Sequence, residues 1–156
     1  DMTDEMIEAA RRNAAKAGHG NIDVRKGLIE ALPVDDNSVA WVISNCVINL
    51  SPDKARVFRE AFRVLKPGGR LAISDVVATA ELPDAMRRDA GLVAGCIGNA
   101  SLVSELERFL AEAGFEAVRI QPKDGSREFI RDWAPGRGVE NYVMSATIEG
   151  LKPDRR

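Results

Sequence analysis

The amino-acid sequence predicts an α/β fold, in which helices cover both faces of a sheet that ends in an antiparallel hairpin. A nearly unbroken apolar run at residues 39–48 is typical of a strand buried on both faces of a parallel sheet, and residues 70–77 predict another buried strand. Segments with a helical apolar period alternate with the expected strands, and this alternation favours an α/β sheet. Because no helix is expected between the last two strands, we predict that they pair as the hairpin.

The composition indicates one globular domain and excludes several classes of partner. Of the 156 residues, 45% are apolar and 29% are charged, as is ordinary for globular proteins. The 22 basic and 24 acidic residues are interspersed and give a net charge of -2, so we expect no nucleic-acid partner, which would need a basic surface. No run approaches the roughly 20 apolar residues of a membrane span, so we expect no membrane partner and a cytoplasmic location.

The first 50 residues predict one helix and two strands. Thr3 is a suitable helix cap, and the apolar positions after it keep a helical period up to Gly18. Polar and apolar residues then alternate over residues 21–26, as in a strand with one covered face. After a polar loop, the apolar run at residues 39–48 is expected to be a central strand of the sheet.

The next segment predicts a helix followed by a strand. Ser51, Pro52 and Asp53 supply a cap, a first-turn proline and a first-turn acid. The helix that they begin is expected to end at the Pro67-Gly-Gly turn, and residues 70–77 are expected to form the strand. Beyond this strand, a weaker pattern predicts a helix near residues 84–93, in a segment that we expect to be a mobile cover over a site.

The C-terminal part predicts one more helix and two strands. Ser101 or Ser104 can cap a helix that ends at Gly114. Residues 115–120 and 142–148 follow as strands, with a loop between them. We expect residues 1–150 to form the domain and residues 151–156 to be a disordered tail.

Several short strings of residues together identify a resemblance. The sharpest are Asn-Cys-Val-Ile-Asn-Leu at residues 45–50 and Ala-Gly-Cys at residues 94–96. The other strings lie at residues 51–54, 63–69, 74–75, 127–133 and 142–147. Over almost the whole chain, these strings resemble the arsenite methyltransferases, which are class I S-adenosylmethionine-dependent methyltransferases. The resemblance implies a Rossmann-like sheet and methyl transfer from S-adenosylmethionine to thiolate-bound trivalent arsenic.

Two cysteines are the catalytic and arsenic-binding residues that the resemblance implies. Cys46 and Cys96 would bind arsenic(III) as thiolates, since soft sulfur ligands prefer soft, polarisable centres. The substrate would be arsenite or methylarsenite, as a thiol conjugate, and a thiol reductant would be a second partner. The alternative is that each cysteine is only a small buried hydrophobic residue, as free cysteines often are.

The resemblance also implies a set of residues that bind S-adenosylmethionine. These residues are Asp1, Met2, Leu28, Ile29, Glu30 and Asn45. Asp1 would accept hydrogen bonds from the ribose hydroxyls, with Met2 beside the adenine. Residues 28–30 would meet the adenine edge, and Asn45 would lie behind the methionine end. The alternative is that the apolar members belong to the core and the acids are solvated.

The chain has no Gly-x-Gly turn between an expected strand and an expected helix, where such a loop would let a cofactor approach the backbone. The resemblance implies that this loop and the first strands precede the position of Asp1. We therefore expect a partial methyltransferase domain that lacks its N-terminal part. By itself it should bind S-adenosylmethionine poorly and be inactive or weakly active.

Two other functions remain open at this point. The chain could methylate another small molecule, like the methyltransferases of ubiquinone biosynthesis, and its cysteines would then be incidental. It could also be a non-catalytic thiol module that binds arsenic or a soft metal. Cys46→Ser separates these functions. A loss of arsenite affinity supports an arsenite methyltransferase or a thiol module, whereas no effect supports a methyltransferase of another small molecule.

Overall fold

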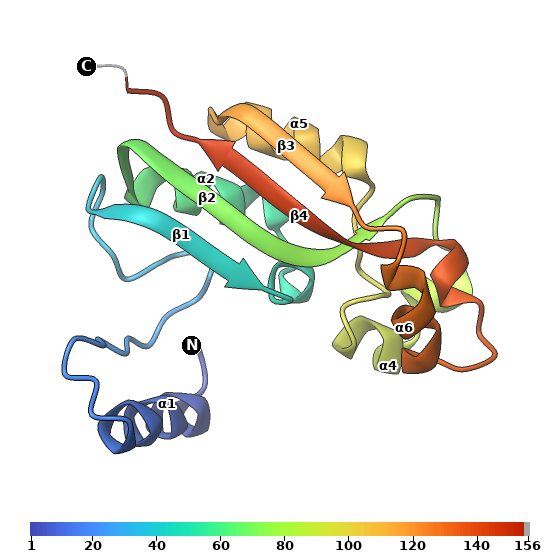
Figure 1. Cartoon of the computed structure of the whole chain (residues 1–156), viewed down its shortest axis with the longest axis horizontal. Coiled ribbons are helices and arrows are strands. Elements are labelled where there is room, and N and C mark those ends of the chain that lie inside the picture. The colour runs from blue at the N-terminus through green and yellow to red at the C-terminus, as the bar shows by residue number, and fades with distance from the viewer. Residues whose placement is uncertain (155–156) are drawn as a thin grey trace.

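The computed structural model describes residues 1–154, which form one four-stranded mixed sheet with helices packed against it (Figure 1). In chain order the elements are α1 (Asp4–Lys16), β1 (Val39–Asn45), η1 (Ile48–Leu50), α2 (Lys54–Val64), β2 (Leu65–Ala78), α3 (Asp84–Arg87), α4 (Ala90–Ala94), α5 (Val103–Ala113), β3 (Glu116–Pro122), α6 (Ser126–Trp133), η2 (Val139–Asn141) and β4 (Val143–Leu151). The predicted α/β class is confirmed.

The sheet has the strand order β1-β2-β4-β3 within the described residues. β1 and β2 are parallel and are joined through α2, whereas β4 runs antiparallel to both of its neighbours. The predicted antiparallel pairing of the last two strands is therefore confirmed. However, their connection contains α6, where only a loop was expected.

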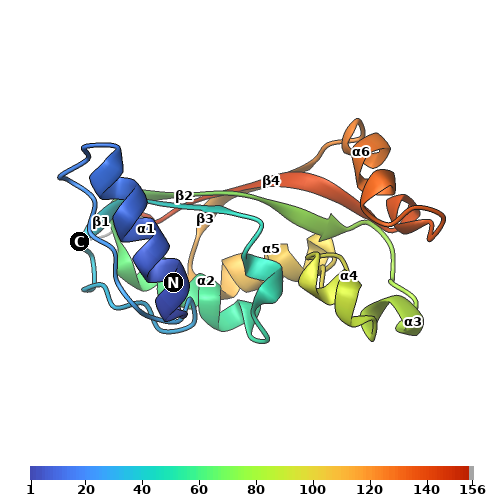
Figure 2. The same ribbon diagram turned by 90° about the horizontal axis from the view of Figure 1, so that it is seen from below.

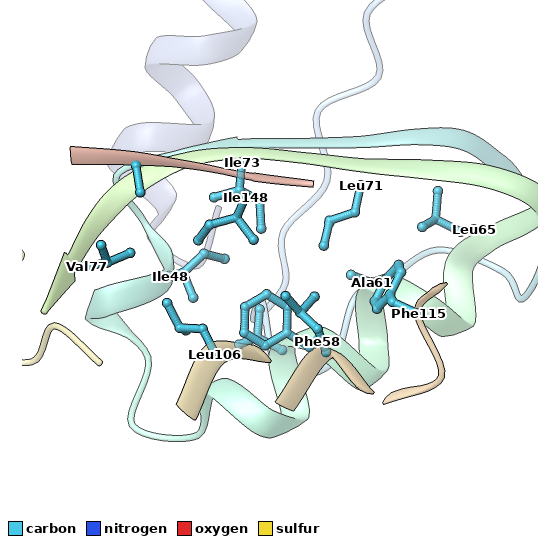
Figure 3. Close-up of a cluster of buried hydrophobic side chains, with 13 residues drawn as sticks. Ile48, Phe58, Ala61, Leu65, Leu71, Ile73, Val77, Leu106, Phe115 and Ile148 are labelled. Atoms are coloured by element: carbon cyan, nitrogen blue, oxygen red, sulfur yellow. The ribbon is translucent and has the colours of Figure 1, made fainter. Parts of the chain in front are cut away.

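One face of the sheet is covered by α2 and α5 (Figure 2). A continuous apolar core fills the space between these helices and the sheet (Figure 3). Phe58 and Leu110 are fully buried there, one from each helix. Asp53 begins α2, because its carboxylate accepts a hydrogen bond from the Arg56 N–H at 2.9 Å. This packing fixes the turn between β1 and α2, which is where the candidate site lies.

The opposite face of the sheet is open along β1, so the predicted burial of residues 39–48 on both faces is wrong. Trp41 is 54% exposed and Ile43 is 77% exposed. Within residues 1–154, β1 has a strand neighbour only on its β2 side. On this second side of the sheet, α6 packs against β4 (Figure 2). The apolar run identified a strand correctly, but not its position at the edge of the sheet.

The N-terminal segment does not contain the strand that was expected at residues 21–26. α1 is present as predicted, although Ile7 is its one buried residue. The segment after α1 is irregular, and its backbone finds local partners. For example, the Gly27 N–H donates to the Asp1 carbonyl at 2.9 Å. A single strand without a neighbour leaves its backbone groups unpaired, so an alternating pattern alone does not produce one.

The segment between β2 and β3 differs from its prediction in two details. The helix expected at residues 84–93 is divided into α3 and α4, because the Asp89 side chain accepts from the Leu92 N–H and begins a new helix. Neither expected serine caps α5. Instead, the Glu105 carboxylate accepts from the Leu102 N–H at 3.0 Å.

The C-terminal end is more ordered than expected. β4 extends to Leu151, and Lys152 is buried. The disordered tail predicted for residues 151–156 is therefore wrong for its first two residues, because the sheet and a buried side chain hold them. Residues 155–156 of that tail lie outside the described residues.

Lys152 caps the C-terminal end of α2 with hydrogen bonds from its ammonium group. Its Nζ donates to Asn37 Oδ1 and to the carbonyls of Phe62 and Leu65, each at 2.7 Å. The same ammonium lies 4.6 Å from the centroid of the Phe62 ring. The last carbonyls of a helix have no partner within the helix, so this side chain satisfies groups that would otherwise be buried without a donor.

We expect Lys152→Ala to lower the free energy of unfolding by about 2–4 kcal/mol, since hydrogen bonds to a charged group contribute about 1.5–3 kcal/mol each. Urea denaturation followed by circular dichroism measures this change. Lys66→Ala is the matched control, because Lys66 is exposed and surface substitutions change stability by about 0.5 kcal/mol or less. Equal stability of the two variants would contradict the role of Lys152.

Candidate functional site

Two cysteines from distant parts of the chain meet at the carboxyl end of β1. Cys46 directly follows this strand, and Cys96 follows α4. Their sulfur atoms and a carboxylate oxygen of Asp75 all lie within 4.8 Å of one another. The Cys96 thiol donates to the Cys46 carbonyl at 3.2 Å. The structure thus brings together the two cysteines that the sequence singled out.

Both cysteines have a left-handed backbone conformation. The φ angle is 55° at Cys46 and 65° at Cys96, values that are uncommon for residues other than glycine. Such strain persists where the surrounding structure enforces it, and it clusters at functional sites. Here the Cys46 N–H donates to the Ser74 carbonyl at 2.9 Å, which holds the first cysteine against β2.

A buried carboxylate lies beneath the sulfur pair. Asp75, on β2, is 4% exposed. Its Oδ2 accepts from the Ile48 N–H at 3.0 Å, and its Oδ1 accepts from the Val76 N–H at 2.7 Å and from Asn49 Nδ2 at 3.1 Å. The Asn49 amide also donates to the Val76 carbonyl at 2.7 Å and to the Cys96 carbonyl at 3.1 Å. One buried side chain therefore links the loops that carry the two cysteines.

A second set of hydrogen bonds ties the Cys96 loop to the start of α2. Asn99 Nδ2 donates to the Asn49 carbonyl at 2.8 Å and to the Ser51 carbonyl at 3.1 Å. Lys54, which is buried, donates to the Asn99 carbonyl and to Ser101 Oγ. Because these groups are satisfied by one another, the two loops form a preorganised polar frame under the sulfurs.

Burial raises the pKa of both site thiols. Burial, followed by the nearby Cys46 thiol and Asp75 carboxylate, raises the pKa of Cys96 to about 12. Burial and then Asp75 also raise the pKa of Cys46, against the opposing effect of its hydrogen bond with Cys96. Burial likewise raises the pKa of Asp75 above its usual range, although hydrogen bonds from Val76 and Ile48 oppose this. The pair is therefore suited to a ligand that removes the thiol protons as it binds.

We expect the alkylation rate of Cys96 in the folded chain to rise about tenfold per pH unit through pH 9.0, since only the thiolate reacts. The alkylation rate of an ordinary thiol, with a pKa of 9.0, levels off at that pH. Iodoacetamide labelling followed by mass spectrometry measures the rate, and the urea-unfolded chain is the control. Levelling off near the same pH in the folded and unfolded chains would contradict a raised pKa.

Four of the residues expected to bind S-adenosylmethionine lie around two cavities. Asp1, Leu28 and Ile29 line an open cavity of about 650 Å³ beside Arg25. A carboxylate that can accept from hydroxyls next to apolar side chains suits the adenosine part of the cofactor. Ile29 also reaches a second, mostly apolar cavity of about 350 Å³, which runs along β1 and includes Asn45.

The other two expected cofactor residues, Met2 and Glu30, do not line either of these cavities. Met2 is 62% exposed. Glu30 is half-buried, and its carboxylate accepts a hydrogen bond from Ser51 Oγ. The second cavity is lined by Asn45 and Val47, the residues on either side of Cys46, so the sulfur site borders an apolar space.

The buried polar frame was missed when the sequence alone was considered. Asp75 and Asn49 were part of the resembling strings, but no role was assigned to either. The position of Asp75 on a buried strand was the one available signal, because a carboxylate in such a run is costly unless it is hydrogen-bonded. Nothing in the sequence indicated that Asn99 and Lys54 would meet beneath the sulfurs.

Comparison with known proteins places the chain among methyltransferases. Residues 1–114 match the family described as a methyltransferase domain. The arsenite methyltransferase of Halobacterium salinarum is 56% identical over 155 residues, which are 99% of this chain and 40% of that protein. The chain therefore spans about two-fifths of the length of this curated relative. Within residues 1–154, no helix is long and apolar enough to cross a membrane.

Solved structures show the same fold. An arsenic(III) S-adenosylmethionine methyltransferase from Chlamydomonas reinhardtii superposes with a TM-score of 0.70 and 32% identity, over 98% of this chain and 53% of that chain. A phosphoethanolamine N-methyltransferase from Haemonchus contortus, solved with S-adenosylmethionine, has a TM-score of 0.77 and 16% identity, over 98% of this chain and 42% of that chain. The second likeness concerns the fold alone. The expected Rossmann-like class I methyltransferase fold is confirmed.

Proposed function

Because this chain belongs to the methyltransferase domain family, we propose that it carries the arsenic-binding site of an enzyme that methylates trivalent arsenic with S-adenosylmethionine. The observation that carries the proposal is the convergence of two sulfur atoms, from Cys46 and Cys96, at the carboxyl end of β1. Open α/β sheets bind their ligands at this end of the strands. The likeness to arsenite methyltransferases along nearly the whole chain supports arsenic as the substrate.

Arsenite binding exchanges two hydroxyl groups of arsenous acid for two cysteine sulfurs. Each thiol gives its proton to a departing hydroxyl, so two As–S bonds form, two water molecules leave, and the oxidation state of arsenic does not change. This exchange suits the raised pKa values of Cys46 and Cys96, because no free thiolate has to accumulate first. Methylarsenite can bind by the same exchange, whereas a thiol conjugate of either acid binds by releasing its own thiols in place of water.

The residues of the chain would orient the bound arsenic and keep water away from it. Trivalent arsenic retains one lone pair, and attachment to two fixed sulfurs determines where this lone pair points. Its attack on a methyl carbon then gains from proximity and alignment. The apolar cavity beside Cys46, lined by Val47 and Phe58 among others, provides a region of low polarity next to the reacting atom.

S-adenosylmethionine, when bound, supplies an electrophilic methyl group on its sulfonium. Asp1, Leu28 and Ile29 are the residues that we propose hold its adenosine part, since they line one cavity. Asn45 is proposed to lie toward its methionine end, because it adjoins Cys46. These contacts alone are few, which supports weak cofactor binding by this chain.

Methyl transfer converts the arsenic from the trivalent to the pentavalent state. A further round of methylation therefore requires a thiol reductant, which is a second proposed partner. Both cysteines are free, and free thiols persist in the reducing cytoplasm, which is the proposed location.

Methyl transfer is tested by incubating the chain with arsenite, a thiol reductant and S-adenosylmethionine labelled in its methyl group. We expect slow formation of labelled methylarsenic, and none from Cys96→Ser. Calorimetric titration of S-adenosylmethionine is expected to show weak binding. Equal methylation by the unchanged chain and by Cys96→Ser would contradict the proposed role of the cysteine pair.

A further inference from the structure

A third ligand atom accompanies the two sulfurs at the site. A carboxylate oxygen of Asp75 lies within 4.8 Å of the sulfur atoms of both Cys46 and Cys96. A carboxylate is not needed to exchange hydroxyl for sulfur on arsenic, but beside two sulfurs it adds a third atom that can bind a cation. Two thiolates and one carboxylate are a ligand set that zinc and its heavier relative cadmium accept.

We propose that Cys46, Cys96 and Asp75 together form a three-ligand site for a soft divalent cation of the zinc and cadmium type. The cation would occupy the two sulfurs that bind arsenic and would thereby inhibit arsenic binding. The cation site stands independently of the function proposed above, whereas the inhibition rests on that function.

The hydrogen bonds of Asp75 hold its carboxylate beside the sulfurs. Oδ1 accepts from Val76 and Asn49, and Oδ2 accepts from Ile48. A carboxylate oxygen lies within 4.8 Å of both sulfurs, so a cation bound there would share Asp75 with these donors.

The distances require only a small contraction. In a tetrahedral zinc site, bonds of roughly 2.0–2.3 Å place neighbouring ligand atoms about 3.6 Å apart. The ligand atoms of this site lie within 4.8 Å of one another, so they have to approach by about 1 Å. Cys46 is only half-buried, which leaves its side chain free to turn and the fourth position of the cation open to water.

The charge of Asp75 distinguishes the two ligands. Cation binding releases two thiol protons to solvent, forms two metal–sulfur bonds and one metal–oxygen bond, and involves no oxidation or reduction. The divalent charge offsets the buried charge of Asp75, a carboxylate oxygen of which lies within 4.8 Å of both sulfurs. Arsenite binds with no net charge and gains no charge attraction from the carboxylate. Removing the charge of Asp75 should therefore weaken cation binding selectively.

Titration of the chain with cadmium, followed by the ultraviolet absorption of cadmium–thiolate bonds, tests the proposal. We expect one cadmium per chain, and competition with arsenite when both are present. Asp75→Asn should weaken cadmium binding by about 10–100-fold, the usual effect of changing a residue that supports a metal site, and should weaken arsenite binding by a clearly smaller factor, through the polar frame alone. Asp132→Asn, on the exposed face of α6, is the matched control and should change neither affinity.

Cadmium nuclear magnetic resonance spectroscopy of the unchanged, cadmium-loaded chain is a second measurement, which does not depend on the stability of a variant. The chemical shift should report two sulfur ligands together with oxygen. Absence of cadmium binding, a shift without two sulfurs, or equal weakening of cadmium and arsenite by Asp75→Asn would overturn the proposal. Cadmium binding without arsenite binding would support the cation site and contradict the proposed function.

Discussion

Cys46→Ser is expected to lower the arsenite affinity of the chain by about 10²–10⁴-fold. Two linked groups that bind one ligand gain about this factor over either group alone, because the second bond forms within the complex. The frame made by Asn49 and Asn99 holds the two cysteine loops together before arsenite arrives, so little of this gain is lost in ordering the site. A serine hydroxyl is a hard ligand and does not replace the soft sulfur.

Calorimetric titration with arsenite measures this effect and gives the stoichiometry, which should be one arsenic per chain. Leu50→Ser is the matched control, since it introduces the same hydroxyl four residues after Cys46 at a side chain that is 53% exposed. Its affinity should stay close to that of the unchanged chain. If Cys46→Ser bound arsenite as tightly as this control does, the cysteine pair would not be the arsenic site.

Phe58→Ala is expected to lower the free energy of unfolding by about 3–5 kcal/mol, the usual cost of removing a buried phenylalanine side chain. Phe58 is completely buried in the core between α2 and the sheet (Figure 3). The loss combines the transfer of the ring to water with the cavity that remains. Because small domains are stable by only about 5–15 kcal/mol, this substitution should remove a large part of the total.

Urea denaturation, followed by far-ultraviolet circular dichroism, measures the change. Phe129→Ala removes the same ring from α6, where the side chain is 47% exposed and packs on Trp133 at a ring-centroid distance of 5.5 Å. We expect this control to lose about 1 kcal/mol, the size of an aromatic pair interaction. A similar loss in both variants would mean that the core between α2 and the sheet does not dominate stability.

The elements that the sequence predicted well are those with a strong local pattern. α2 combines an Asp53 cap with buried residues at helical spacing, and β2 and β4 have the pattern of strands in a covered sheet. α6 was missed because Gly125 and Pro135 flank a short segment, and turn residues outweighed its one turn of apolar spacing. The expected strand at residues 21–26 failed for a different reason: a strand requires a neighbour, which a local pattern does not supply.

The candidate site was predicted in part. Cys46 and Cys96 were singled out through a resemblance, and their proximity depends on how α4 packs against η1, which no local pattern contains. Asp75 and Asn49 were not assigned a role, because the function of a buried polar side chain depends on partners that are distant in the sequence. Lys152 shows the same limit: a charged residue near the C-terminus indicated a tail, yet its ammonium closes α2.

X-ray absorption spectroscopy at the arsenic edge tests the proposed arsenic site most directly. Recorded on the arsenite-loaded chain, it shows whether the sulfur atoms of both cysteines bind one arsenic atom. We expect two sulfur neighbours and one oxygen neighbour around trivalent arsenic, and a single sulfur neighbour in Cys96→Ser. A spectrum with one sulfur or none in the unchanged chain would contradict the account.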